Sequence, residues 1–109
     1  MDKEELKKNF PGIIASVVVT RDGDPLEIDL PDNVSPQTFS IMCATIMGAA
    51  ATANKEMGGE IPQYIVVESQ ITSLLIIRTA KKCILGCVVE NGADKDSILQ
   101  GMKEVAENM

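Results

Sequence analysis

The spacing of apolar residues changes several times along the chain, and each change predicts a new helix or strand. Residues 2–9 are mostly charged, and Leu6 lies four positions before Phe10, which is the spacing of a short amphipathic helix. Residues 13–20 are mostly apolar and β-branched, as in a strand that is covered on both faces. The predicted order is a helix at 2–9, strands at 13–20 and 26–30, a helix at 36–57, strands at 64–68, 73–78 and 83–89, and a last helix that begins near Asp94.

Turn-forming residues separate these elements. Pro11-Gly12 ends the first helix, and Asp22-Gly23 supplies the positive φ angles of a tight hairpin turn. Ser35 and Pro36 are a typical N-cap and first helical residue, and Gly58-Gly59 ends the helix that they begin. The connections between strands are short enough for hairpins, so we expect one five-stranded antiparallel sheet. The predicted fold is therefore α/β (α+β), in the order α-β-β-α-β-β-β-α, with the long helix on one face of the sheet and the two terminal helices on the other.

The charges on the strands predict which two form the edges of this sheet. Strand 26–30 alternates strictly, so we expect its three apolar residues to face the core and its acids, Glu27 and Asp29, to face solvent. Such charges protect an edge strand from pairing with another chain. Residues 64–67 are apolar on both faces, and this strand carries no charged residue before Glu68. We expect this strand to be an unprotected edge, although the pattern also allows a central position.

The long helix carries more apolar and small side chains than one sheet can cover. Its main apolar stripe is Phe39, Met42, Cys43, Ile46, Ala50, Ala53 and Met57. Small residues allow two helices to approach closely, and an unprotected strand beside them favours pairing of two copies of the chain. The predicted dimer interface consists of Tyr64, Ile65, Val66 and Val67 from the strand and Met47, Gly48 and Ala51 from the helix.

Composition excludes several classes of partner. The 109 residues include 10 basic and 16 acidic side chains, and the net charge of −6 argues against nucleic acid. The long uncharged stretch at 33–54 contains Pro36, Gln37 and several hydroxyl residues, and is too polar for a membrane span. No signal peptide is evident at the N-terminus. We expect a single domain over residues 1–109, in the cytoplasm, without direct membrane insertion.

Residues that usually carry catalysis are scarce. The chain has no histidine, which removes the commonest general base and metal ligand. Cys83 and Cys87 would lie about 13 Å apart along a strand, too far for a disulfide or a shared metal, and Cys43 is placed in the long helix. Arg21 and Arg78 are the only arginines, and we interpret them as a turn residue and a strand-end residue rather than as arginine fingers. No catalytic residue, metal or cofactor is therefore expected.

The complete layout resembles a known family. Phe10-Pro11-Gly12-Ile13 leads into the first strand, Arg21-Asp22-Gly23 turns into the second, an alanine-rich helix over 39–57 follows, and then come Tyr64-Ile65-Val66-Val67-Glu68, strands at 74–78 and 83–89, and a closing helix. In this order and spacing the chain resembles the Roadblock/dynein light chain family, in its short stand-alone archaeal and bacterial form, over nearly its entire length. The resemblance implies a profilin-like three-layer sandwich. It also implies that two copies pair through the third strand and the long helix into a ten-stranded sheet.

The resemblance further implies a function. Members of this family bind Ras-like small GTPases and in some cases stimulate GTP hydrolysis, whereas others are scaffold subunits. We therefore expect a non-enzymatic homodimeric regulator or adaptor of a Ras-like small GTPase. The alternatives are a scaffold subunit that pairs with another roadblock-like chain, and a small-ligand sensor or thiol enzyme that uses Cys83 or Cys87. The family's partner-binding face surrounds the paired long helices, where the polar residues of this chain are Thr52, Asn54, Lys55 and Glu56.

Overall fold

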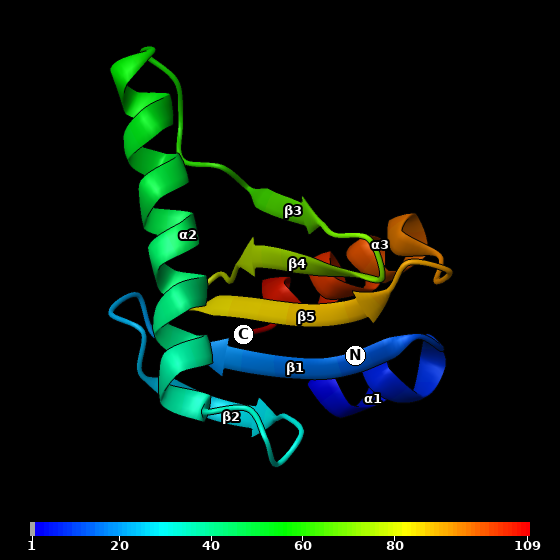
Figure 1. Ribbon diagram of the computed structural model, residues 1–109. Helices are drawn as coiled ribbons and strands as arrows, with labels where there is room; N and C mark the ends of the chain where they lie inside the picture. The colour runs from blue at the N-terminus through cyan, green and yellow to red at the C-terminus, as the bar shows by residue number, and fades with distance from the viewer. Residues whose placement is uncertain (1) are drawn as a thin grey trace.

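The computed structural model describes residues 2–109, and it places one sheet between two layers of helices (Figure 1). The sheet is antiparallel throughout, and its strands lie in the order β2-β1-β5-β4-β3. The predicted element order and fold class are confirmed. The elements are α1 (Lys3–Asn9), β1 (Ile13–Val19), β2 (Pro25–Asp29), α2 (Pro36–Glu56), β3 (Tyr64–Glu68), β4 (Thr72–Arg78), β5 (Ile84–Glu90) and α3 (Lys95–Glu107).

The ends of the helices follow the predicted capping residues. The Ser35 hydroxyl accepts a hydrogen bond from the backbone N–H of Thr38 at 3.3 Å, and the Asp94 carboxylate accepts one from Ser97 at 3.1 Å. These side chains satisfy N–H groups that have no partner in the first turn of a helix. Gly58 has a φ of 76°, the left-handed conformation that commonly ends a helix. Local sequence therefore fixes where α2 and α3 begin and where α2 ends.

Alternation along the strands divides the core into two halves. Val17 and Val19 of β1 pack in the half that α2 covers, together with Cys43 and Met47. Val18, between them, packs on the opposite face, which α1 and α3 cover. The helical residues of that second half are Leu6, Ile98, Met102, Val105 and Ala106. The predicted distribution of helices over the two faces is confirmed.

The helix α2 is longer than the sheet is wide. Its 21 residues extend over about 31 Å, at about 1.5 Å per residue. Five strands separated by about 4.8 Å span only about 19 Å from one edge strand to the other. Because α2 crosses the strands, its last turns project beyond β3 (Figure 1). Every residue of α2 from Thr52 onward is exposed.

This projection explains why part of the predicted apolar stripe is wrong. Met57, the C-cap of α2, lies on the projecting part and is 89% exposed. Met42 is 48% exposed for a different reason, since the helical period places it in the second turn on a side away from the buried face. Ala53 is also exposed. The fully buried face of α2 consists of Ser40, Cys43 and Met47. The helical period was correct, but the pattern does not show how far the helix extends beyond its sheet.

The orientation predicted for β2 is also wrong, although its edge position is confirmed. Leu26 and Ile28 are both largely exposed, because only Leu30, just after the strand, packs into the core half beneath α2. The Asp29 side chain is not free in solvent as the sequence predicted, but contacts another element. Its carboxylate accepts a hydrogen bond of 2.7 Å from Lys7 Nζ of α1. Asp29 therefore contacts α1, Glu27 is exposed as predicted, and the apolar side chains of Leu26 and Ile28 are left uncovered.

One buried polar group predicts a stabilising substitution. Ser40 is fully buried, and its hydroxyl has no hydrogen-bond partner among the described residues. An unpaired buried hydroxyl is destabilising, and alanine is also the better helix former. We expect Ser40→Ala to raise the free energy of unfolding by about 1 kcal/mol in urea denaturation. The control is Thr45→Ala, since the Thr45 hydroxyl is exposed and donates to the Ile41 carbonyl at 2.8 Å. A loss of stability in Ser40→Ala would contradict the prediction.

Candidate protein-interaction edge

The strand β3 forms an open edge of the sheet, with β4 as its one neighbour. The backbone N–H of Arg78 donates to the carbonyl of Gln63 at 3.3 Å. Hydrogen-bonded pairs alternate along an antiparallel ladder, so Ile65 and Val67 also bond toward β4. Tyr64, Val66 and Glu68 therefore direct their N–H and C=O groups away from the sheet. These outward groups are free to form a ladder with another strand.

The side chains of β3 leave both faces of this edge apolar and accessible. Ile65 and Val67 pair with Ile76 and Leu74 of β4, on the α2 face, while Val66 is on the α3 face. Val66 and Val67 are 43% and 39% exposed, although valine in a sheet is usually buried. The position of an unprotected edge, predicted from the sequence, is thus observed. The alternative of a central position is wrong.

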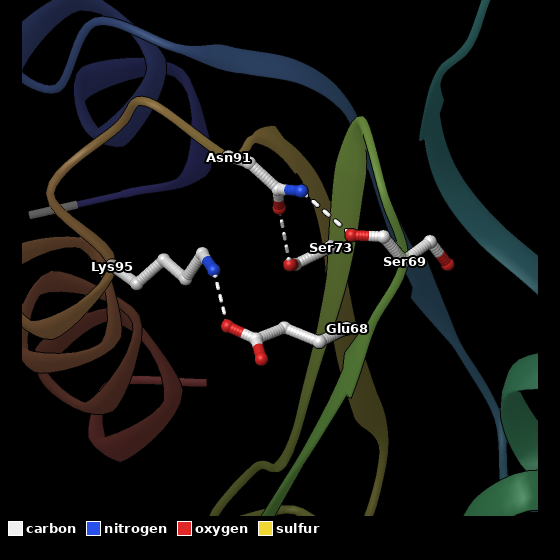
Figure 2. A network of polar contacts seen from close by, with 5 residues as sticks. All are labelled: Glu68, Ser69, Ser73, Asn91 and Lys95. Atoms are coloured by element: carbon white, nitrogen blue, oxygen red, sulfur yellow. Dashed lines mark hydrogen bonds and ion pairs between the residues drawn. The ribbon is translucent and has the colours of Figure 1, made fainter.

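The face of β3 next to α3 is held by two lysines. Lys103 Nζ lies 5.1 Å from the centroid of the Tyr64 ring, in cation–π geometry. Lys95 Nζ donates to Glu68 at 2.6 Å (Figure 2). This hydrogen bond and the lysine charge lower the pKa of the Glu68 carboxyl. Both contacts fix the strand against α3 without covering its outer backbone.

The turn after β3 is clamped to the loop before α3. Figure 2 shows the Asn91 amide between two groups of this turn region. Its Nδ2 donates to the Ser69 carbonyl at 2.6 Å, and its Oδ1 accepts from the Ser73 hydroxyl at 2.8 Å. The backbone N–H of Asn91 also donates to the Ile71 carbonyl at 3.0 Å. One side chain thus fixes the far end of the open edge.

Two isoleucines that the sequence analysis did not single out extend the apolar edge. Ile71, in the turn after β3, is 78% exposed, and Ile61, in the loop before β3, is 40% exposed. The sequence offered one indication of their exposure. An isolated isoleucine in a turn or loop is not part of the apolar pattern of a strand or helix, so nothing directs its side chain into the core. They lie in the segments that flank β3, at either end of the strand.

The predicted interface residues of α2 lie in different environments. Met47 is buried beneath the helix, in the core half that α2 covers. Gly48 is exposed and Ala51 is half-buried, and both line a cavity between α2 and the ends of the strands. The structure therefore groups the four β3 residues on one open edge. The α2 residues are separate from that group, with Met47 in the core and Gly48 and Ala51 at the cavity.

The polar end of α2 is exposed, as the projection of the helix requires. Thr52, Lys55 and Glu56 are exposed on its last turns. Asn54 has a structural role, because its side-chain amide donates to the Glu60 carbonyl at 3.0 Å and its own carbonyl accepts from Gly59 at 2.7 Å. Of the four predicted partner-binding residues, Asn54 thus closes the loop that follows the helix.

Two of the three thiols are buried. Burial raises the pKa of the Cys43 thiol to about 11 and that of Cys87 to about 12, so both are protonated near neutral pH. Cys83 is half-buried. No group of three or more His, Cys, Asp or Glu side chains within residues 2–109 is placed to hold a metal ion. Nor is any helix in this part of the chain long and apolar enough to cross a membrane.

Comparison with known proteins agrees with this architecture. The family model described as Roadblock/LC7 domain matches residues 3–90. The Roadblock/LC7 domain from Streptomyces avermitilis superposes with a TM-score of 0.87 at 18% identity, over 96% of this chain and 88% of that one. Myxococcus xanthus MglB gives 0.85 at 15% identity, over 94% and 84% of the two chains. No curated protein matches the sequence.

A more distant structural match supports the predicted three-layer sandwich. Acanthamoeba castellanii profilin II has a TM-score of 0.56 at 17% identity, over 89% of this chain and 84% of that one. At such identities the structural matches show the fold alone. The profilin-like architecture is therefore confirmed.

The open edge generates a prediction about assembly. Val66→Pro removes an outward N–H while leaving the bonds toward β4, and Val66→Lys adds a charge at the same place. We expect the unaltered protein to be a dimer by light scattering after gel filtration, and either variant to be a folded monomer, since each change costs a few kcal/mol at the interface. The control is Leu26→Lys, on the other edge strand, which should stay dimeric. A dimeric Val66→Pro protein would place the interface elsewhere.

Proposed function

The chain belongs to the Roadblock/LC7 domain family, and on this basis we propose that it is a non-enzymatic homodimeric regulator or adaptor of a Ras-like small GTPase. The observation that carries the proposal is the open β3 edge, beyond which the end of α2 projects (Figure 1). The chain presents a surface for protein contacts and has no histidine for acid–base catalysis.

Two-fold pairing through β3 accounts for both unsatisfied features of the chain. A partner strand would bond to the outward N–H and C=O groups of Tyr64 and Val66 and cover the apolar side chains of the edge. The partner's sheet would then continue beneath the last turns of α2, which have no sheet beneath them in one chain. Gly48 and Ala51 would lie at the helical margin of this interface, and Met47 would support it from within the core.

The GTPase would bind the face formed by the two long helices. Thr52, Lys55 and Glu56 supply its polar groups, because they are exposed at the end of each α2. Asn54 contributes indirectly by holding the loop that begins at Gly58. Binding of this kind can hold a GTPase at one place in the cell, or stabilise one conformation of the nucleotide site that the GTPase itself provides.

A scaffold role is the second candidate, and the edge itself favours it. The outward groups of β3 are backbone groups, so they would accept the edge strand of a related chain as readily as that of a second copy. A heterodimer with another roadblock-like chain would use the same residues. The scaffold role and the regulator role differ in whether a guanine-nucleotide-binding protein is bound.

Affinity capture from native lysate tests the proposal. The immobilised protein is exposed to lysate in the presence of GDP or of a non-hydrolysable GTP analogue, and retained proteins are assayed for guanine-nucleotide binding. We expect one nucleotide state to retain a small GTPase. The Val66→Pro monomer should lose it, because the binding face needs both helices. Retention of a related chain alone, with no nucleotide-binding protein in either state, would favour the scaffold role and contradict the GTPase proposal.

The purified partner then tests the face itself. Lys55→Glu reverses a charge at the end of α2, and we expect it to weaken binding by about tenfold, or about 1.4 kcal/mol, while leaving the dimer intact. The matched control is Lys81→Glu, an exposed lysine in the turn between β4 and β5, whose backbone N–H donates to the Met109 carbonyl just after α3. Equal loss in both variants would indicate a general charge effect and contradict a contact at Lys55.

A further inference from the structure

A cationic cavity of about 270 Å³ lies between α2 and the turns at one end of the sheet. Its lining residues come from four segments: the turn after β1, the middle of α2, the loop before β3, and the β4–β5 connection with the adjoining strand ends. Its lining includes Arg21, Ala44, Gly48, Arg78, Lys82 and Cys83. The two arginines of the chain, which are far apart in the sequence, therefore meet in one place.

The positive charge in this cavity is unpaired. Three of the ten basic residues line it, and no aspartate or glutamate does, although the chain has a net charge of −6. The ion pairs within residues 2–109 are Lys7–Asp29 and Lys95–Glu68, so neither arginine nor Lys82 has a carboxylate partner there. Like charges held together repel, and in an acidic protein such a group indicates an anionic ligand.

The turn that carries Lys82 is built to hold its shape. The Thr79 hydroxyl accepts from the Cys83 N–H at 3.0 Å, and the Lys82 N–H donates to the Thr79 carbonyl at 3.0 Å. The Ala80 N–H also donates to the Ala106 carbonyl of α3, at 3.0 Å. Lys82 itself has a φ of 64°, a left-handed conformation that is uncommon for lysine. The backbone of the turn that carries Lys82 is thus fixed by hydrogen bonds.

The rest of the cavity lining is apolar. A Cβ atom added at Gly48 would meet no atom within 4 Å, so Gly48 borders open space beside α2. Ala44, Ile61 and Ile84 supply further apolar lining. A ligand that fits this lining has a small anionic end for the cations and room for carbon atoms beside the helix.

We propose that this cavity binds a phosphate group, either as the free ion or as a monoester of a small molecule. Two guanidinium groups and an ammonium carry three positive charges, of which a phosphate dianion would balance two, and guanidinium binds phosphate oxygens through paired hydrogen bonds. A single carboxylate would leave more of this charge unmatched. The site lies within one chain and does not depend on the proposed GTPase binding.

Titration followed by 15N NMR tests the proposal on the intact protein. Inorganic phosphate, phosphoserine and succinate are added separately at low salt, and the amide signals of Gly48 and Cys83 are followed. We expect saturable shifts with phosphate or phosphoserine. Tighter binding of phosphoserine identifies the monoester as the ligand class, and tighter binding of inorganic phosphate identifies the free ion. Absence of saturable shifts at these amides, or equal affinity for succinate, would overturn the proposal.

Adjacent lysines provide a matched pair of variants. Lys82→Gln and Lys81→Gln remove the same charge from neighbouring positions of one turn, but only Lys82 lines the cavity. We expect phosphate binding to weaken at least about tenfold in Arg78→Gln and about threefold to tenfold in Lys82→Gln, and to change less than about twofold in Lys81→Gln. Equal weakening by the two lysine variants would mean a diffuse charge effect and would overturn the site.

Alkylation of Cys83 gives a second readout. Cys83 lines the cavity, whereas Cys43 and Cys87 are buried. Because the cavity is cationic, it should raise the rate at which anionic iodoacetate alkylates Cys83 relative to the rate of neutral iodoacetamide. This iodoacetate-to-iodoacetamide rate ratio should fall at least about threefold in Lys82→Gln but not in Lys81→Gln. Saturating phosphate should slow the reaction of Cys83 with iodoacetate about as much as Lys82→Gln does. A ratio that responds to neither Lys82→Gln nor phosphate would contradict the proposal.

Discussion

The structure depends on a mismatch between a helix and the sheet that it covers. A helix of 21 residues crosses five strands, and it is about 12 Å longer than the distance between the edge strands. Its first turns bury Ser40, Cys43 and Met47 against the sheet, and its last turns have nothing beneath them in the same chain. The edge below that projection, β3, is also the edge that exposes apolar side chains and unpaired backbone groups. One addition, a further sheet beside β3, would satisfy both features.

The rest of the fold holds that edge in place while leaving it open. The α3 lysines contact Tyr64 and Glu68 from one face, and Asn91 clamps the turn at the end of the strand (Figure 2). These contacts are polar or cation–π contacts at the surface, so each contributes little to stability. Their effect is to fix the position of β3. A strand already held in the sheet loses less conformational entropy when it pairs, which favours association.

Local chemistry explains why much of the fold could be predicted from the sequence. Capping residues, glycine turns and hairpin spacings are encoded within a few residues, and they located the helices and strands closely. The free edge was also predictable, because charge and hydropathy along β3 are visible in the sequence. The inward face of β2 and the outer part of the α2 stripe were predicted wrongly, since the reach of a helix across a sheet depends on the packing of distant elements. The cavity at Arg21 and Arg78 was not predicted, because turns from distant parts of the chain come together only in the folded structure.

Residue-resolved hydrogen exchange tests pairing at β3 most directly. In the ladder of one chain, the amides of Ile65 and Val67 bond to β4, and those of Tyr64 and Val66 point outward. Pairing of two copies predicts that all four amides exchange slowly in the concentrated protein, and that Tyr64 and Val66 lose their protection on dilution while Ile65 and Val67 keep theirs. Fast exchange of Tyr64 and Val66 at every concentration, beside protected Ile65 and Val67, would contradict a β3-mediated dimer.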